Sequence, residues 1–456
     1  MPRSASAGTP GVARGRLTGE DEVRSLDRAR VLDARHRRRP LRLLWLLVGP
    51  GILVMLGEND GPSMISYATS GATYGLGFFL PFIVVTFVAA MVVQEMAMRV
   101  GAVTHRGYGE LVFQRYGRFW GWLTAGDLLL TNLFTLITEF IAMRVGMAYF
   151  GIPPALAVAC GVALVAVSLA GGRYWRWERA ALGLASFNLL FVVAAFLARP
   201  DPGRIAHAFA TWSPLPGGGL QPFLLLVVSD IGATVTPWMV FFQQSAVVDK
   251  GMTPRDLREG RLDVVIGGVV AAAAGCGALV AASVLFGHPQ ELATLQGGAG
   301  FPAALARVGG RPLAAVFALG LVEAGALAAL TISASTGYAM GEAISGAHSF
   351  NRRLTDAPLF YVLILASALS AGLVVLIPGA PLLAIALNAN LFATALLPSA
   401  LVFLIMLAND RELMGSKSNG RLLNLVAVVV VVAVAVASAA YGLVAAATRL
   451  GGGSGG

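Results

Sequence analysis

Long apolar runs, separated by short polar segments, make up most of the sequence from residue 43 onwards. A run of about 18 or more apolar residues is long enough to cross a bilayer as a helix. Such runs predict an all-α polytopic membrane protein with about eleven spans, at 43–75, 77–101, 119–149, 153–171, 178–198, 221–249, 263–286, 312–346, 358–377, 381–408 and 421–447.

The first span stops being apolar near its middle. Residues Glu58 to Ser63 read Glu-Asn-Asp-Gly-Pro-Ser, so three polar side chains precede two residues that do not easily continue a helix. A charged side chain at the centre of a membrane helix costs roughly 3 kcal/mol on insertion scales. Free backbone groups in hydrocarbon cost more unless protein or water satisfies them. We therefore expect helix 1 to be unwound at 58–63, as half of a substrate site.

The sixth span is interrupted at Thr236-Pro237. Proline lacks an amide donor and clashes with the preceding turn, which frees carbonyls near Ala233 and Thr234. With a carboxylate from helix 1, these groups form an oxygen-only site that favours hard cations such as Mg²⁺, Mn²⁺ or Ca²⁺. The alternative is a proline kink that neighbouring helices satisfy.

The two interrupted helices lie five spans apart. They therefore occupy matching positions in two halves of five helices, and an odd number of spans inverts the second half relative to the first. This pattern is typical of inverted-repeat secondary transporters whose site lies at the membrane midplane. We expect a transmembrane domain at 43–447, with repeat one at about 43–198, repeat two at about 221–408, and an extra helix at 421–447.

Composition supports the membrane assignment. Of the 456 residues, 57% are hydrophobic and 12% are charged, and the mean hydropathy is +0.74, whereas soluble domains carry about 25% charged residues. Cys160 and Cys276 both lie in apolar runs, so neither a disulfide framework nor a cysteine metal site is expected. The sequence has no phosphate-binding glycine motif with a lysine and no intramembrane histidine beside a nucleophile, so we expect no ATP, no cofactor and no enzymatic activity.

The net charge of +9 has its source in the loops. Most of the 33 Lys and Arg residues fall in segments on the side of the N-terminus, which predicts a multi-pass protein of the inner (plasma) membrane with a cytoplasmic N-terminus. Residues 1–42 are expected to be a disordered basic tail that contacts anionic lipid, not nucleic acid. Residues 451–456, which read GGGSGG, are expected to be a linker or tag remnant.

Several short motifs resemble the Nramp family of divalent-metal transporters over residues 42–447. They are the acid at Asp60 and the segments Gly49–Gly51, Gly151–Pro153, Gly232–Pro237 and Asn409–Gly415. The resemblance implies a LeuT-like fold. It also implies a metal site built from an Asp-Pro-Gly-Asn motif on helix 1 and a Met-Pro-His motif on helix 6.

The sequence departs from that family pattern at both half-sites. The first motif appears as Asp-Gly-Pro-Ser at 60–63, and the second as Thr236-Pro237-Trp238. A hard oxygen replaces the thioether that selects soft metals, and an indole that carries no titratable proton replaces histidine. On helix 3 the family's Asp falls on Leu136, while its Glu matches Glu139. All histidines fall in tails, loops or helix ends, at His36, His105, His207, His288 and His348.

These departures resemble the Nramp-related magnesium transporters, a branch that the resemblance implies moves Mg²⁺ and Mn²⁺ without proton coupling. The expected metal ligands are Asp60, Ser63 and Thr236 with the carbonyls of Gly57, Ala233 and Thr234, partly through water. Further polar groups are expected around the ion or along its path: Glu58, Asn59, Glu139, Asp230, Trp238, Gln243, Gln244 and Asn390.

Several of these residues have a structural interpretation as well. Glu58 either joins the ion site or braces the broken backbone. Asp230 either attracts cations or pairs with an arginine such as Arg144. Asn390 either approaches the ion or packs between helices. Four single buried acids can form salt bridges that brace the scaffold: Glu95, Asp127, Glu139 and Glu323. This role is the expected one for Glu95, which is four residues before Arg99 on the same helix.

The expected function is alternating-access transport of Mg²⁺, with Mn²⁺ as a companion, by a monomer in the lipid bilayer. Membrane potential would drive uptake, at about 2.3 kcal/mol per charge per 100 mV. The alternatives are a proton-coupled transition-metal transporter, a transporter of a small organic cation, a passive cation channel, and a metal sensor that transports nothing.

Overall fold

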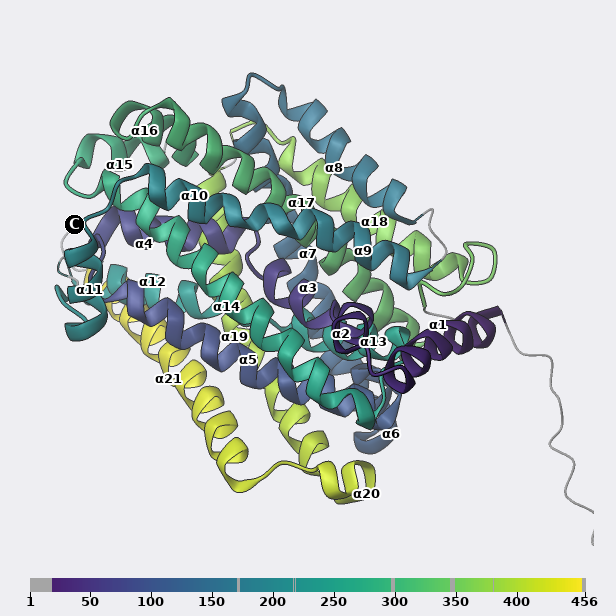
Figure 1. Cartoon of the computed structure of the whole chain (residues 1–456). Coiled ribbons are helices and arrows are strands. Elements are labelled where there is room, and N and C mark those ends of the chain that lie inside the picture. The colour runs from purple at the N-terminus through teal and green to yellow at the C-terminus, as the bar shows by residue number, and fades with distance from the viewer. Residues whose placement is uncertain are drawn as a thin grey trace, which may run out of the picture.

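The computed structural model describes residues 19–169, 173–215, 217, 219–296, 300–344, 349–379 and 381–452, with side chains described from residue 27 to residue 444. All regular elements in these ranges are helices, as predicted. The long helices lie side by side in one bundle (Figure 1). Nine of them are long and apolar enough to cross a membrane, or ten if the bent pair at the start of the first span is counted.

The first five predicted spans correspond to eight helical segments. They are α2 (Pro40–Leu47), α3 (Pro50–Gly57) and α4 (Gly61–Tyr74), then α5 (Phe79–Thr104), α7 (Arg118–Tyr149), α8 (Pro154–Ser168), and α9 (Tyr174–Ala185) continued by α10 (Leu190–Leu197). The 3₁₀ segment η2 (Ser186–Leu189) interrupts the fifth span between α9 and α10.

The remaining six spans follow the predicted order. They are α12 (Leu220–Gly232) with α13 (Pro237–Lys250), α14 (Leu257–Ala282) with η4 (Ser283–Leu285), α17 (Arg311–Ala343), α18 (Pro358–Val375), α19 (Leu382–Asn409) and α21 (Arg421–Gly452). Shorter elements lie in the tail and the loops: α1 (Gly19–His36), α6 (Tyr108–Tyr116), α11 (Pro202–Thr211), η3 (Pro254–Asp256), α15 (Pro289–Gln296), α16 (Gly300–Val308), α20 (Arg411–Met414) and η5 (Gly415–Lys417).

The broken helices meet in the middle of the bundle. From the two breaks, α3 and α13 run toward the face that carries α1, here called the N-terminal face, and α4 and α12 run toward the opposite face (Figure 1). This antiparallel arrangement of half-helices is the one that two inverted repeats produce.

The break in the first span is shorter than the predicted 58–63. Only residues 58–60 are non-helical, and Gly61–Ser63 form the first turn of α4. The reason is a helix cap: the side chain of Asp60 accepts a hydrogen bond from the backbone N–H of Ser63 at 2.9 Å. Pro62 fits this first turn because its missing N–H has no partner there in any helix. The span also bends by 49° between α2 and α3.

Residues 19–36 of the predicted disordered tail form the helix α1, while residues 1–18 lie outside the part of the chain that the structure describes. Val31 and Ala34 are buried on one face of this helix, and Val31 packs in a cluster with Met98 of α5 and Val247 of α13. The arginines that suggested disorder instead form ion pairs. Asp256 accepts hydrogen bonds from Arg28 at 2.7 Å and from Arg35 at 2.9 Å.

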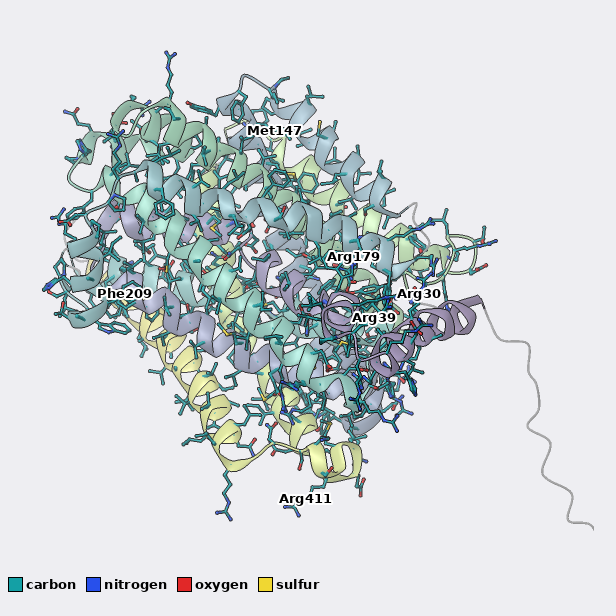
Figure 2. The ribbon with its side chains drawn as sticks, viewed as in Figure 1. Arg30, Arg39, Met147, Arg179, Phe209 and Arg411 are labelled. Atoms are coloured by element: carbon teal, nitrogen blue, oxygen red, sulfur yellow. The ribbon has the colours of Figure 1, made fainter. Side chains whose placement is uncertain are left out.

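Basic side chains gather at the N-terminal face. Arg30, Arg39 and Arg179 lie at the end of the molecule that carries α1 (Figure 2).

The motif at 409–415 forms the turn that follows α19. Arg115 lies 2.6 Å from Asp410 and holds the pKa of that carboxyl below its ordinary value, while Asp410 caps α20.

A buried ion pair holds the start of α3. Lys250, the last residue of α13, forms an ion pair with Glu178 of α9, and neither side chain is exposed. The ammonium group also donates to the carbonyl of Val48 at 3.1 Å. Beside this pair, Asp263 of α14 accepts hydrogen bonds from the backbone N–H groups of Gly49 and Gly51 at 3.0 Å and 2.7 Å. The half-helix α3 is thus tied to three other spans at the N-terminal face.

We expect Lys250→Met to lower the stability of the protein by about 3–5 kcal/mol, because it leaves the Glu178 carboxylate buried without a partner. The double variant Lys250→Met/Glu178→Gln should recover much of this loss. Thermal unfolding of the purified proteins in detergent measures both effects. A double variant as unstable as the single one would show that the ion pair is not the source of the effect.

Candidate metal-binding site

One hydrogen bond joins the two helix breaks. The hydroxyl of Thr236, which precedes α13, donates to Oε2 of Glu58 at 2.8 Å. Both side chains are buried. The indole N–H of Trp238 faces the same carboxylate without a hydrogen bond of normal geometry. The carboxylate that reaches Thr236 is that of Glu58, and not that of Asp60 as expected from the sequence.

Asp60 faces α7 instead. Besides capping α4, its carboxyl lies beside the carboxyl of Glu139. Glu139 in turn accepts a hydrogen bond from the backbone N–H of Gly61 at 2.8 Å. Ala142 is on the same face of α7, and a Cβ at Gly61 would lie 2.2 Å from its Cβ. The third span, α7, therefore supplies an acid to the first break. The absence of a side chain at Gly61 permits the close approach of α7 and α4.

Tyr67 satisfies part of the second break. Its hydroxyl donates to the carbonyl of Ala233 at 2.7 Å and lies 2.9 Å from the hydroxyl of Thr234. The carbonyl of Ala233, expected to be free for a cation, thus has a protein partner. Tyr67 was not among the residues expected at the site, although it lies two helical turns after Asp60, at i+7, on the same side of α4.

Several buried polar atoms around the breaks lack a hydrogen-bond partner among the described residues. They are Glu58 Oε1, Asn59 Oδ1, Ser63 Oγ, Glu139 Oε1 and Trp238 Nε1. A buried polar atom without a partner costs about 1–3 kcal/mol, so native proteins satisfy such atoms with water or a ligand. Four of the five are oxygens, which is the donor type that a hard cation prefers.

The acids of the site do not form a compact metal cluster. In the part of the chain that the structure describes, no group of three or more His, Cys, Asp or Glu side chains is arranged to hold a metal ion. A cation between the breaks would therefore take several of its ligands from water, hydroxyls or backbone carbonyls. Gly57, whose carbonyl is one such candidate, ends α3 close to the Trp238 ring and to Thr331 of α17.

Asp230 lies on α12, toward the opposite face, and braces the half-helices there. Its two carboxylate oxygens accept hydrogen bonds from Ser66 at 2.6 Å and from Ser70 at 2.8 Å, both on α4. The alternative that Asp230 pairs with Arg144 is wrong, because Arg144 donates to the carbonyl of Val375 at 2.7 Å. Asp230 therefore holds α4 to α12 on the side away from the N-terminal face.

Polar side chains continue from the breaks toward the N-terminal face. Gln243 is buried on α13, and both ends of its amide lack a partner among the described residues. Gln244 donates to the carbonyl of Arg106 at 2.9 Å, and its oxygen has no partner among the same residues. These two amides can hydrogen-bond water along the α13 half of the site. Asn390 of α19 is buried beside Gly232, at the end of α12, and no described residue pairs with its amide nitrogen.

Other acids of the spans have the structural roles expected of braces. Arg99 pairs with Glu95 at 3.1 Å, as predicted from their i, i+4 spacing, and Arg261 pairs with Glu95 at 2.9 Å. Asp127 accepts a hydrogen bond from Ser399.

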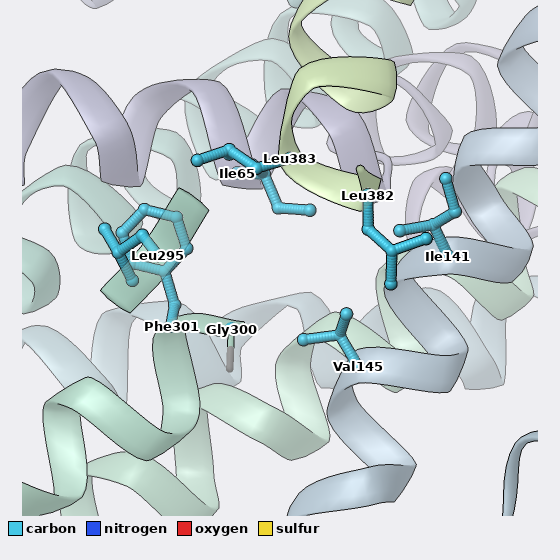
Figure 3. Close-up of a pocket in the computed structure, with 8 residues that line it drawn as sticks. All are labelled: Ile65, Ile141, Val145, Leu295, Gly300, Phe301, Leu382 and Leu383. Atoms are coloured by element: carbon cyan, nitrogen blue, oxygen red, sulfur yellow. The ribbon is translucent and has the colours of Figure 1, made fainter. Parts of the chain in front are cut away.

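Toward the opposite face the surroundings become apolar. A cavity between α4, α7, α16 and α19 is lined by aliphatic and aromatic side chains (Figure 3). Ile65, two residues after Ser63, borders it together with Ile141 and Leu382. The side of α4 that faces α7 and α16 is therefore apolar within one turn of the break, whereas its side toward α12 stays polar through Ser66 and Ser70.

The fold and the paired breaks define a polytopic membrane protein with the architecture of inverted-repeat transporters. The family model described as "Natural resistance-associated macrophage protein-like" matches residues 51–444. The chain therefore belongs to the Nramp family, as the motifs predicted.

Individual relatives and solved structures agree with this membership. The Divalent metal cation transporter MntH 1 of Pseudomonas aeruginosa is 27% identical over 85% of this chain and 89% of its own length. MntH of Mycobacterium leprae is 25% identical over 83% and 87%. A crystal structure of the Eremococcus coleocola manganese transporter superimposes with a TM-score of 0.72 at 21% identity, covering 88% of this chain and 86% of that one.

The fold is also shared with a transporter outside the family. Mhp1, a nucleobase-cation-symport-1 family transporter, matches with a TM-score of 0.51 at 13% identity, over 88% of this chain and 93% of that chain. At such low identity the likeness shows the fold alone, and the predicted LeuT-like fold is confirmed.

The hydrogen bond between the breaks can be tested through stability. We expect Thr236→Val to cost about 1.5–3 kcal/mol, because it removes the donor of a hydrogen bond to a charged group and leaves both oxygens of Glu58 unpaired. Thr236→Ser keeps the hydroxyl and should lie close to the wild type. Thermal unfolding in detergent distinguishes the two, and equal losses for Val and Ser would contradict a role of the hydroxyl.

Proposed function

We propose that this protein moves Mg²⁺, with Mn²⁺ as a second substrate, by alternating access and without proton coupling. Membership of the Nramp family makes it a divalent-metal cation transporter of the membrane and not an enzyme. The observation that supports Mg²⁺ is the set of unpaired buried oxygens around the two breaks, in a site whose helix 6 contributes Thr236 and Trp238.

Hard donors and retained water favour Mg²⁺ over softer metals. Mg²⁺ gives up its water reluctantly and is bound in proteins by one or two carboxylates while several waters remain. Glu58 and Asp60 are carboxylates of this kind, and Asn59, Ser63 and Thr236 can hydrogen-bond the remaining waters. A thioether or imidazole, which would favour transition metals, is replaced in the helix 6 motif by a hydroxyl and an indole.

The histidine that could carry a proton from the helix 6 motif is absent, which supports transport driven by membrane potential alone. Trp238, in its place, has no titratable proton. We also propose that a single chain is the working unit, because one chain contains both broken helices. Its N-terminus would be cytoplasmic, in accord with the basic side chains at the N-terminal face (Figure 2).

Uptake into proteoliposomes tests this proposal directly. Purified protein is reconstituted with a Mg²⁺-sensitive dye inside, and a K⁺ gradient with valinomycin sets a negative internal potential. We expect saturable Mg²⁺ and Mn²⁺ uptake that increases with the potential, with no acidification reported by a pH dye. Asp60→Ala should lower uptake at least tenfold, and Glu95→Gln, an acid remote from the breaks, serves as the control.

Each alternative has its own result in the same assay. Acidification that accompanies metal entry would show proton coupling, and uptake of an organic amine in place of Mg²⁺ would show a different substrate. Single-channel conductance would show a channel, and binding without flux would show a sensor. Full uptake by Asp60→Ala would place the substrate elsewhere.

The helix 6 motif should set metal preference. We expect Thr236→Met to raise the uptake of Cd²⁺ relative to Mg²⁺ by about tenfold, because a thioether binds soft metals and cannot hydrogen-bond the water around Mg²⁺. Thr236→Leu, which is similar in size but has no sulfur, is the matched control. Competition between Cd²⁺ and Mg²⁺ in the liposome assay measures the ratio, and equal ratios for Met and Leu would contradict a role of the sulfur.

A further inference from the structure

A chain of amide side chains leads from the first helix break to an acid on α17. The Nδ2 group of Asn59 donates to Oδ1 of Asn188 at 2.7 Å, and also to the carbonyl of Ala271 on α14 at 2.9 Å. The Nδ2 group of Asn188 then donates to Oε2 of Glu323 at 3.3 Å. Three spans thus meet around Asn188, on a side of the breaks that is separate from Glu139 and Thr236.

The carboxylate of Glu323 has little to balance its charge. The side chain is 4% exposed, and its one hydrogen bond from the described residues is the 3.3 Å contact from the neutral amide of Asn188. Its second oxygen, Oε1, has no partner among the described residues, and no charged side chain among them acts on it. An isolated carboxylate is costly in such surroundings unless a cation or a proton neutralises it.

Other buried acids of the bundle have partners that explain them. Glu178 pairs with Lys250, and Asp263 accepts three backbone N–H groups at the start of α3. Glu342, on the same helix as Glu323, accepts hydrogen bonds from the hydroxyl of Ser245 at 2.6 Å and from the N–H of Gly109 at 2.8 Å. Glu323 therefore differs from these acids, because a single neutral amide is its only donor among the described residues.

The fifth span changes its geometry at Asn188. The 3₁₀ segment η2 interrupts the α-helix at 186–189, and Asn188 is its fully buried member. A 3₁₀ stretch inside a long helix often marks a functional position. Here the 3₁₀ segment places the buried amide of Asn188 between the first break and α17. An aliphatic side chain would be sufficient at this position if packing were its only role.

We propose that Glu323 and Asn59 hold a second cation, a small monovalent metal ion of the Na⁺ class, next to the divalent-metal site. Two buried oxygens of the amide chain, Oε1 of Glu323 and Oδ1 of Asn59, lack donors in the part of the molecule that the structure describes. A proton on Glu323 neutralises its charge but leaves the oxygen of Asn59 unsatisfied. A metal ion can be bound by several oxygens at once, and one positive charge balances the single carboxylate.

The position of Asn59 gives this second site a route to the first. Asn59 lies between Glu58 and Asp60 in the three-residue break. An ion bound by Asn59 therefore changes the backbone and the field at both acids, and its occupancy couples to that of the divalent site by linkage. This coupling is the same for a divalent site that holds Mg²⁺ and for one that holds Mn²⁺.

Thermal unfolding in matched salts tests the second site. The purified protein is titrated with NaCl against choline chloride at constant ionic strength, without divalent metal. A ligand that binds only the folded state raises Tm, and we expect a saturable increase of about 2–4 °C with Na⁺ for the wild type. Glu323→Gln should remove this increase, and Glu342→Gln, an acid of the same helix that already has donors, should keep it.

The outcomes separate this site from the divalent site. Asp60→Ala should lose Mg²⁺ uptake and still show the Na⁺-dependent increase in Tm, so failure of one proposal is distinguishable from failure of the other. The second site is excluded if the wild type shows the same Tm in Na⁺ and choline, a result that needs no variant to fold. It is also excluded if Glu323→Gln keeps the full increase, or if Tm responds only to pH through Glu323, which would mean a bound proton.

Discussion

Backbone groups without partners are the constraint on which this structure depends. In hydrocarbon each such group costs several kcal/mol, and the bundle contains two breaks at which helical hydrogen bonds are lost. The protein meets this cost with side chains from other spans: Glu139 accepts from the backbone at Gly61, and Tyr67 donates to the carbonyl of Ala233. Tyr67 of repeat one thereby reaches the break of repeat two, so the requirement to satisfy the breaks also builds the site.

The half-helices are held at both faces by different chemistry. At the N-terminal face, α3 is tied by a buried ion pair and by Asp263. On the other side, α4 and α12 are tied by the carboxylate of Asp230 and two serines. Removal of one partner of a buried ion pair is costly.

The polar groups around the breaks divide into those that the protein satisfies and those that it leaves unpaired. Asp60 and Thr236 are in the first group, since each has a protein partner. Ser63 and one oxygen each of Glu58, Asn59 and Glu139 are in the second. The unpaired oxygens surround the break from several helices, which is compatible with an ion that keeps part of its water. Glu323 extends this second group away from the breaks toward α17.

The sequence by itself determined the spans, the two breaks and the family, because apolar length, proline and intramembrane charge are local signals. It did not determine which acid faces which helix. Glu58 and Asp60 are two residues apart in a non-helical segment, where backbone direction changes at each residue, and only packing against α7 and α13 decided that Asp60 meets Glu139 and Glu58 meets Thr236. The amide chain from Asn59 to Glu323 likewise joins residues far apart in the sequence. Contacts of this kind depend on how the spans pack, and no local pattern in the chain encodes them.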